Sequence, residues 1–175
     1  MLADTPDNER SNVLKANDLR IDTVQELFDK YSDTNLLFIM EIKDGDARGL
    51  RATDILANLI KEYKLEKRVC IGTFHGEVET KLNEDYPELM KGASVLGAAK
   101  FVITEMFYVN LFDNSNFTCL QIPTYYDLDD LVGIKGEVRL DKKKYIERAH
   151  KRNISVQFWT INDKEEMRKL IELGA

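Results

Sequence analysis

Short apolar runs alternate with amphipathic helical patterns along this chain from residue 20 onward, and this alternation restricts the fold more than any other feature. The apolar runs lie at 36–42, 68–73, 117–123 and 154–161, with a weaker one at 90–94. The helical patterns lie at 23–31, 52–63, 77–86, 98–112, 141–151 and 163–173. Because repeated βα units produce this order, the pattern predicts a parallel sheet covered by helices.

Residues suited to helix capping mark several of the predicted helix starts. Thr23, followed three residues later by Glu26, forms the capping-box pattern of a first helix. We expect the last two helices to begin at Asp141 and at Asn162 or Asp163, because short polar side chains accept hydrogen bonds from the first free N–H groups of a helix.

The predicted series of elements is incomplete for a closed barrel. It begins and ends with a helix and contains some five strands; residues 1–19 show no regular pattern, and we interpret them as an irregular remnant of an insertion before the first helix. The acidic segment 124–140 exceeds the usual connection in a compact domain and is interpreted as a functional loop. We therefore expect residues 1–175 to form a single α/β domain, a partial (β/α)8 TIM barrel of parallel strands alternating with helices, with its first and last strands missing. An independent doubly wound sheet is less favoured, because no Gly-rich phosphate loop follows a strand.

Charge and cysteine usage exclude some classes of protein. The net charge of -6 comes from 25 basic and 31 acidic residues, and it argues against a nucleic-acid binder, since nucleic acid is held mainly by positive charge. Cys70 and Cys119 fall inside predicted strands without metal-ligand spacing, so we expect two small buried hydrophobes rather than ligands or a disulfide. The first residues carry no secretory signal pattern, and Lys100 and Glu105 interrupt the apolar stretch 95–112. We therefore expect a cytoplasmic or membrane-peripheral location.

Polar residues close two of the predicted strands. Glu41 and Lys43 follow the apolar run 36–40, and Trp159 and Asn162 lie at the end of the last run. Side chains alternate along a strand, so Glu41 and Lys43 point the same way, about 7 Å apart. Because α/β folds place their chemistry at the carboxyl ends of strands, these residues predict a site that contains a carboxylate and an ammonium.

Each of these residues also has a structural explanation. Glu41 and Lys43 also fit an exposed strand end, and the single Trp of the chain also fits a core position. Asn162 also fits the cap of the last helix. His75 follows a predicted strand, which is a place suited to an acid or base, whereas His150 lies on a predicted helix and is interpreted as structural.

Five motifs occur in order along the chain: Ile21-Asp22-Thr23-Val24-Gln25-Glu26-Leu27, Met40-Glu41-Ile42-Lys43, Gly72-Thr73-Phe74, Gln157-Phe158-Trp159-Thr160-Ile161-Asn162 and Leu173-Gly174-Ala175. In order and spacing this set resembles the glycerophosphodiester phosphodiesterase family over nearly the whole chain from about residue 20. The resemblance implies a (β/α)8 barrel whose strand ends hold a divalent metal, Ca²⁺ or Mg²⁺, and two histidines that act as general acid and base on a phosphodiester.

The resemblance also implies roles for the residues at the strand ends. Glu41 is similar to a metal carboxylate of the family, and Lys43 is similar to a contact with the substrate phosphate. Trp159 resembles the ring that lines the glycerol or alcohol side of the site. Asn162 follows that ring in the family motif and is expected to shape the same wall.

The chain departs from the family pattern at the catalytic residues. It lacks the family's His-Arg-Gly, Glu-x-Asp and His-Asp strands and its final strand with Thr-Asp, and His75 and His150 match neither catalytic histidine. We therefore expect the C-terminal portion of a metal-dependent enzyme that hydrolyses glycerophosphodiesters to glycerol 3-phosphate and an alcohol, inactive on its own.

Two alternatives stay open at this point. Segment 95–112 and run 119–123 look similar to the lysophospholipase D-type branch of the family, which implies a lysophospholipid substrate. In that case we expect contact with an acyl chain or a membrane surface through Phe101, Phe107, Tyr108 and Phe112. The second alternative is a non-catalytic α/β binding module. The sequence does not determine the oligomeric state.

Overall fold

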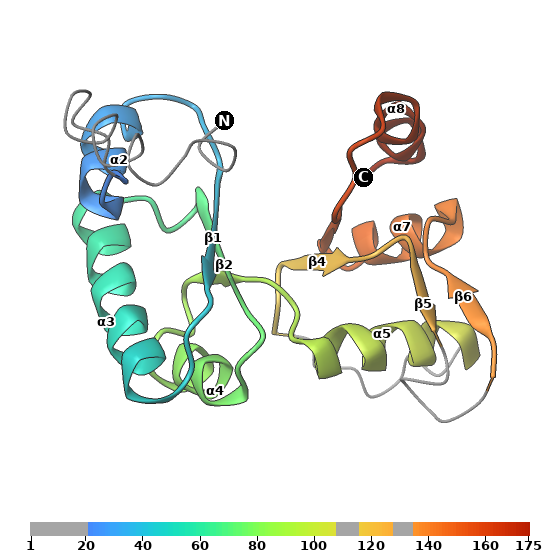
Figure 1. Ribbon diagram of the computed structural model, residues 1–175, viewed down its shortest axis with the longest axis horizontal. Coiled ribbons are helices and arrows are strands. Elements are labelled where there is room, and N and C mark those ends of the chain that lie inside the picture. The colour runs from blue at the N-terminus through green and yellow to red at the C-terminus, as the bar shows by residue number, and fades with distance from the viewer. Residues whose placement is uncertain (1–20, 108–115, 128–134) are drawn as a thin grey trace, which may run out of the picture. The chain divides into compact units, whose positions relative to one another are not determined.

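The computed structural model of this protein describes residues 21–107, 116–127 and 135–175 (Figure 1). The chain divides into two compact units, Met1–Leu36 and Leu37–Ala175. The prediction for residues 1–19 lies outside the described residues, and the prediction of a single domain stays a prediction.

The first unit contains helix α2 (Val24–Tyr31). Its start carries the predicted capping box: the Glu26 N–H donates to Thr23 Oγ1 at 3.2 Å, and the Thr23 N–H donates to Glu26 Oε2 at 2.9 Å. Both bonds satisfy donors that the first turn leaves free, so this local prediction is confirmed.

The second unit begins with a parallel sheet in the order β1-β2-β3. Its strands are β1 (Phe38–Ile42), β2 (Val69–Thr73) and β3 (Met90–Lys91), and the connecting helices are α3 (Asp46–Glu62) and α4 (Gly76–Asp85). Helix α3 packs against β1 and α4, and α4 packs against β2 (Figure 1). Two βα units therefore have the predicted order.

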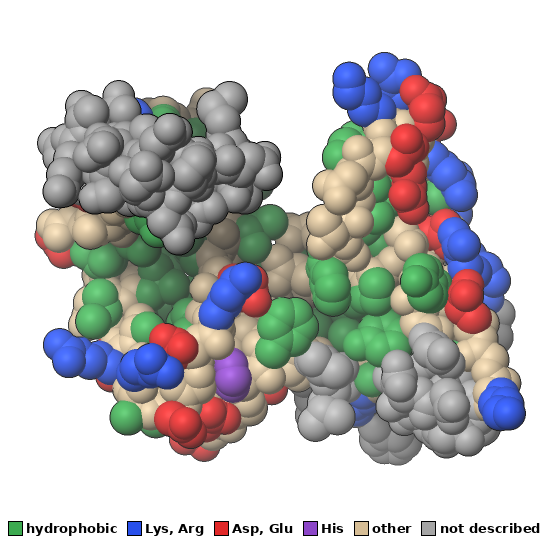
Figure 2. All heavy atoms as spheres, viewed as in Figure 1, with side chains coloured by type: hydrophobic (Ala, Val, Ile, Leu, Met, Phe, Trp, Pro, Cys, Tyr) green, Lys and Arg blue, Asp and Glu red, His purple; other side chains and the backbone are tan. Residues whose placement is uncertain are grey.

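A second parallel sheet pairs β4 (Cys119–Ile122) with β7 (Ser155–Phe158). Helix α5 (Val95–Phe107) contacts β4 and α7 (Lys143–His150), and α7 contacts β7. The last helix, α8 (Lys164–Leu173), follows β7, and basic and acidic side chains gather along it at the upper right of Figure 2. A parallel bridge between Gly92 and Cys119 connects the two sheets, so their strands run in one direction.

The core of the second sheet shows that one predicted surface residue is buried. Phe101 on α5 is only 2% exposed and packs in a cluster with residues of β4, β7 and α7. The expectation that Phe101 touches an acyl chain or a membrane is therefore wrong, because its apolar area is already removed from water. The other residues of that expectation, Tyr108, Phe112 and the side chain of Phe107, lie outside the described residues.

Three element predictions also need correction. Helix α3 begins at Asp46, six residues before the predicted start. The predicted loop 124–140 contains an antiparallel pair, β5 (Tyr125–Asp127) and β6 (Glu137–Arg139). The third correction is that Asp141 is not the N-cap of its helix.

Asp141 does not cap α7, whose N-cap is Lys142. Its carboxylate instead accepts hydrogen bonds from Arg139 Nε at 3.0 Å and Nη2 at 2.6 Å, and from Lys169 Nζ at 3.5 Å. Asp163, rather than Asn162, caps α8 by accepting from the Glu166 N–H at 2.9 Å.

The architecture is the predicted α/β arrangement of parallel strands and helices. The described strands form two parallel sheets connected by one bridge, an antiparallel β5-β6 pair, and no closed barrel. Among the described helices, none combines the length and the apolar character needed to cross a bilayer.

Candidate functional site

A cavity of about 440 Å³ lies at the carboxyl ends of β1, β2, β4 and β7. Its lining residues are Ile39, Glu41, Gly72, Thr73, Phe74, Ala93, Gln121, Gln157, Phe158, Trp159 and Thr160. The strands run in the same direction, so their carboxyl ends share one edge of the sheets. This is the edge at which α/β folds place their binding sites.

Glu41 on β1 contributes the single carboxylate among the residues that line this cavity. It lies opposite Gly72 of β2, which has no side chain of its own. Lys43 Nζ lies 3.7 Å from Glu41 Oε2, so the two side chains share a face as predicted. The Lys43 side chain is 80% exposed and the Glu41 side chain 39% exposed. Such an exposed ion pair contributes little to stability, about 0–1 kcal/mol.

Trp159 forms one wall of the cavity, directly after β7. The backbone N–H of Trp159 donates to the Ile122 carbonyl at 3.2 Å, which fixes the start of this segment against β4. The indole is 44% exposed and meets the Phe74 ring edge to face, with centroids 6.1 Å apart and planes at 80°. Trp159 is therefore a surface aromatic at the site rather than a core residue.

The other predicted site residue, Asn162, is exposed and does not line the cavity. Phe74 belongs to one of the sequence motifs, but the sequence analysis predicted no role for it. Its position immediately after β2 could have indicated a site residue. The structure thus brings Glu41 and Trp159 together, sets Lys43 against Glu41, and leaves Asn162 apart.

Two glutamines that the sequence analysis missed line the cavity between β4 and β7. Gln121 Nε2 donates to Gln157 Oε1 at 3.0 Å, across paired positions of the two strands. A Cβ on Gly72 or Gly92 would lie 2.8 or 2.7 Å from Gln121 Oε1, so a side chain at either position would displace the Gln121 amide. The available signal was a polar residue at an inward position of an otherwise apolar strand.

The loop that follows Lys43 is tied to the start of α4. His75 Nε2 lies 2.9 Å from the Lys43 carbonyl oxygen, and the Asp46 N–H donates to Glu77 Oε1 at 2.9 Å. This backbone hydrogen bond is the main reason why the pKa of Glu77 is held below its ordinary value. A Cβ on Gly45 would lie 2.5 Å from Glu77 Oε1, so the loop approaches α4 too closely for a side chain there.

Neither histidine lines the cavity. His75 takes the N-cap position of α4 and contacts the loop, and His150 is exposed at the end of α7. The sequence predicted that His75 lies at a place suited to an acid or base. In the structure, the His75 side chain instead contacts the backbone carbonyl of Lys43.

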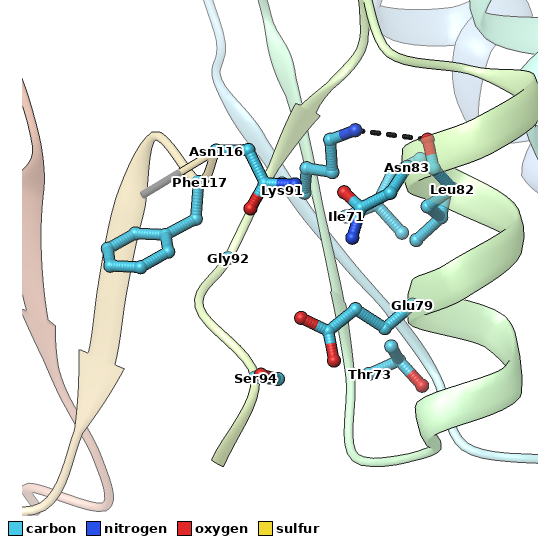
Figure 3. Close-up of a pocket in the computed structure, with 10 residues that line it drawn as sticks. All are labelled: Ile71, Thr73, Glu79, Leu82, Asn83, Lys91, Gly92, Ser94, Asn116 and Phe117. Atoms are coloured by element: carbon cyan, nitrogen blue, oxygen red, sulfur yellow. Dashed lines mark hydrogen bonds between the residues drawn. The ribbon is translucent and has the colours of Figure 1, made fainter. Parts of the chain in front are cut away.

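A second, much smaller cavity lies between β2, β3 and α4 (Figure 3). Its volume of about 10 Å³ has room for roughly one water molecule. Lys91 is buried beside it and donates from Nζ to the Leu82 carbonyl at 3.0 Å, and this burial lowers the pKa of Lys91. Asn83 Oδ1 is buried with no hydrogen-bond partner among the described residues, which suits an ordered water rather than a substrate.

The large cavity is a candidate place for a divalent cation. Ca²⁺ and Mg²⁺ prefer oxygen ligands, so the Glu41 carboxylate is suitable, and Gln121 and Gln157 add amide groups. Within the described part of the chain, however, no three His, Cys, Asp or Glu residues cluster as a metal site. These residues therefore fit one ligand of such a cation rather than a complete coordination shell.

Comparison with solved structures shows what the fold resembles. A glycerophosphodiester phosphodiesterase from Parabacteroides distasonis matches with a TM-score of 0.51 and 18% identity, over 81% of this chain and 52% of that chain. A putative glycerophosphoryl diester phosphodiesterase from Silicibacter pomeroyi matches with a TM-score of 0.55 and 17% identity, over 87% of this chain and 50% of that chain. This chain spans about half the length of those structures, and the likeness confirms the predicted partial barrel fold.

No curated protein matches this chain. The model of the glycerophosphoryl diester phosphodiesterase family, by contrast, matches residues 4–175, which is nearly the whole sequence. The chain belongs to the glycerophosphoryl diester phosphodiesterase family.

Proposed function

We propose that this chain contributes the C-terminal part of the active site of a metal-dependent phosphodiesterase, which hydrolyses glycerophosphodiesters to glycerol 3-phosphate and an alcohol. Membership of the family supports a phosphoric diester hydrolase. The observation that carries the proposal for this site is the shared cavity of Glu41 and Trp159, with the Lys43 ammonium beside the carboxylate.

The side chains around the cavity suit the parts of such a substrate. A phosphodiester carries negative charge on its nonbridging oxygens, and the Lys43 ammonium beside the cavity neutralises that charge. Trp159 and Phe74 offer apolar ring surface to the glycerol or alcohol carbons.

Glu41 is proposed as one ligand of a bound Ca²⁺ or Mg²⁺ ion. Such a cation, when bound, supplies positive charge close to the phosphate oxygens. Glu41 is the one carboxylate in the cavity lining, so any further carboxylate ligand would come from outside the described lining, whereas Gln121 and Gln157 offer amide oxygens within it.

We further propose that residues 1–175 do not turn over substrate alone. Hydrolysis needs a base for the attacking water and an acid for the leaving alcohol, and no histidine lines the described cavity. Incubation of the chain with glycerophosphocholine and Ca²⁺ or Mg²⁺ is expected to release no glycerol 3-phosphate. Metal-dependent release that disappears in Glu41→Gln would contradict this.

Binding tests the site without requiring turnover. Calorimetric titration with glycerol 3-phosphate in the presence of Ca²⁺ is expected to show binding that Lys43→Ala weakens about tenfold, because a charge-assisted contact is lost. Lys67→Ala, which changes an exposed lysine before β2, is the matched control. Absence of binding, or equal loss in both variants, would favour a non-catalytic module instead.

Lysophospholipid is the second candidate substrate class. The exposed rings of Phe74 and Trp159 at the cavity favour an alcohol side with apolar character, although Phe101 no longer supports it. Tighter binding of lysophosphatidylcholine than of glycerophosphocholine, lost in Phe74→Ala, would favour this class.

A further inference from the structure

Two buried thiols lie below the cavity, and the proposed function does not use them. Cys70 on β2 and Cys119 on β4 have their Sγ atoms 3.3 Å apart. They are 8% and 2% exposed, and both are free thiols. Two residues further along the same strands, and therefore on the same face, lie Gly72 and Gln121 of the cavity lining.

The fold explains why these two side chains meet. Strand β3 lies between β2 and β4, since Cys70 is opposite Met90 and Gly92 bridges to Cys119. Inside a barrel of parallel strands, alternate strands contribute side chains to the same interior layer. The two thiols therefore face each other across β3, although no ladder pairs their strands directly.

The two thiols are not equivalent. The hydrogen bond from the Cys119 thiol lowers the pKa of Cys70, because it favours the Cys70 thiolate. The same pairing, together with burial, raises the pKa of Cys119. Cys70 is also the more exposed of the two, at 8% against 2%, and a thiolate is the nucleophilic form of cysteine, so Cys70 is the more reactive member.

We propose that Cys70 and Cys119 form a modification site, a dithiol that a hydroperoxide converts into an intrachain disulfide. The Cys70 thiolate attacks hydrogen peroxide, which gives Cys70 sulfenic acid and hydroxide. The Cys119 sulfur then attacks the Cys70 sulfur; an S–S bond forms, the S–O bond breaks, and the Cys119 proton leaves with the oxygen as water. Two electrons pass from the thiols to the peroxide.

Access and geometry both suit this reaction. Gly72 has no side chain of its own above Cys70, and the Gln121 amide, whose Oε1 would lie 2.8 Å from a Cβ on Gly72, is the flexible group that peroxide displaces on its way from the 440 Å³ cavity. A disulfide needs an S–S separation of about 2.05 Å, so the sulfur atoms must approach by roughly 1.3 Å. Because β3 lies between the two strands, this approach comes from rotation of the two cysteine side chains and small backbone adjustments rather than from a shift of β4 toward β2.

Peptide mapping of the peroxide-treated chain tests the proposal. The wild-type protein is expected to lose two hydrogen atoms in mass and to give a cross-linked peptide that contains Cys70 and Cys119. Dithiothreitol should reverse both changes. The same treatment in concentrated urea is the control, and the cross-link should form at least about tenfold more slowly there, because unfolding separates the thiols.

Two variants test the order of the steps. In Cys119→Ser the sulfenic acid on Cys70 has no thiol partner, so dimedone should label Cys70. In Cys70→Ser the label should be at least about tenfold weaker, because Cys119 is the less reactive thiol. Absence of the cross-linked peptide from the folded wild-type chain would overturn the proposal, and equal labelling of the two variants would overturn the assignment of Cys70 as the attacking residue.

Discussion

The Glu41 carboxylate of β1 and the Trp159 indole that follows β7 line one cavity, although the two residues are near opposite ends of the sequence of the second unit. They meet because parallel strands bring their carboxyl ends to a common edge. Lys43, two residues beyond Glu41, places its Nζ 3.7 Å from the Glu41 carboxylate. This relationship is the basis for the proposed phosphodiester site.

The first prediction concerns metal binding by Glu41. Glu41→Gln keeps the size of the side chain but removes the negative charge, so we expect the affinity for Ca²⁺ to fall at least about tenfold. Calorimetric titration of the chain with CaCl₂ measures this. Glu62→Gln, at the exposed end of α3, is the control and should bind like the wild type. Equal affinities in all three proteins would remove Glu41 from the site.

The second prediction concerns the loop that follows Lys43. Glu77→Ala removes the acceptor of the Asp46 N–H, so the Asp46 amide should exchange with deuterium roughly three- to tenfold faster. Glu84→Ala, on the same helix, is the control and should leave that rate unchanged. An unchanged Asp46 rate in Glu77→Ala would show that the hydrogen bond does not hold the loop.

The third prediction decides between a core role and a membrane role for Phe101. Because its side chain is buried in the core of the second sheet, Phe101→Ala should lower the free energy of unfolding by about 3–5 kcal/mol. Urea denaturation measures the change, and Ile171→Ala on exposed α8 should cost less than about 0.5 kcal/mol. A small loss of stability in Phe101→Ala, with weakened vesicle binding, would restore the membrane role.

The fourth prediction concerns pH and Asp141. Hydrogen bonds from Arg139 are the main reason why the pKa of this nearly buried carboxylate is below its ordinary value of about 3.9. A lowered folded-state pKa stabilises the protein above the unfolded value, and this stability is lost as the pH falls through the folded value.

Asp141→Asn should therefore lower the free energy of unfolding by about 1 kcal/mol at pH 7, and the difference from wild type should shrink progressively below about pH 4. Urea denaturation across this pH range is the measurement. Glu147→Gln, which breaks an exposed pair with Lys143, should change stability little at either pH. A difference for Asp141→Asn that stays constant with pH would show that its charge is not involved.

Local signals in the sequence predicted local structure well. The Thr23 capping box involves residues three positions apart, so the sequence contains all of its partners. Alternation along one strand likewise predicted that Glu41 and Lys43 share a face.

Features that depend on competing or distant partners were missed. Asp141 was expected to cap a helix, but Arg139 and Lys169 compete for its carboxylate. The first turn of α3 lies close to the segment before it, since a Cβ on Gly49 would collide with the Asp44 carbonyl. The cavity residues Gln121 and Gln157 gain their role only when β4 pairs with β7.

Fluorescence of Trp159 tests the central claim most directly, because it is the single tryptophan of the chain and it lines the cavity. Titration with glycerol 3-phosphate in the presence of Ca²⁺ should change its emission saturably, and the change should require higher ligand concentrations in Lys43→Ala and in Glu41→Gln. Emission that does not respond to the ligand, or responds equally in the wild type and both variants, would contradict a phosphate site shared by these three residues.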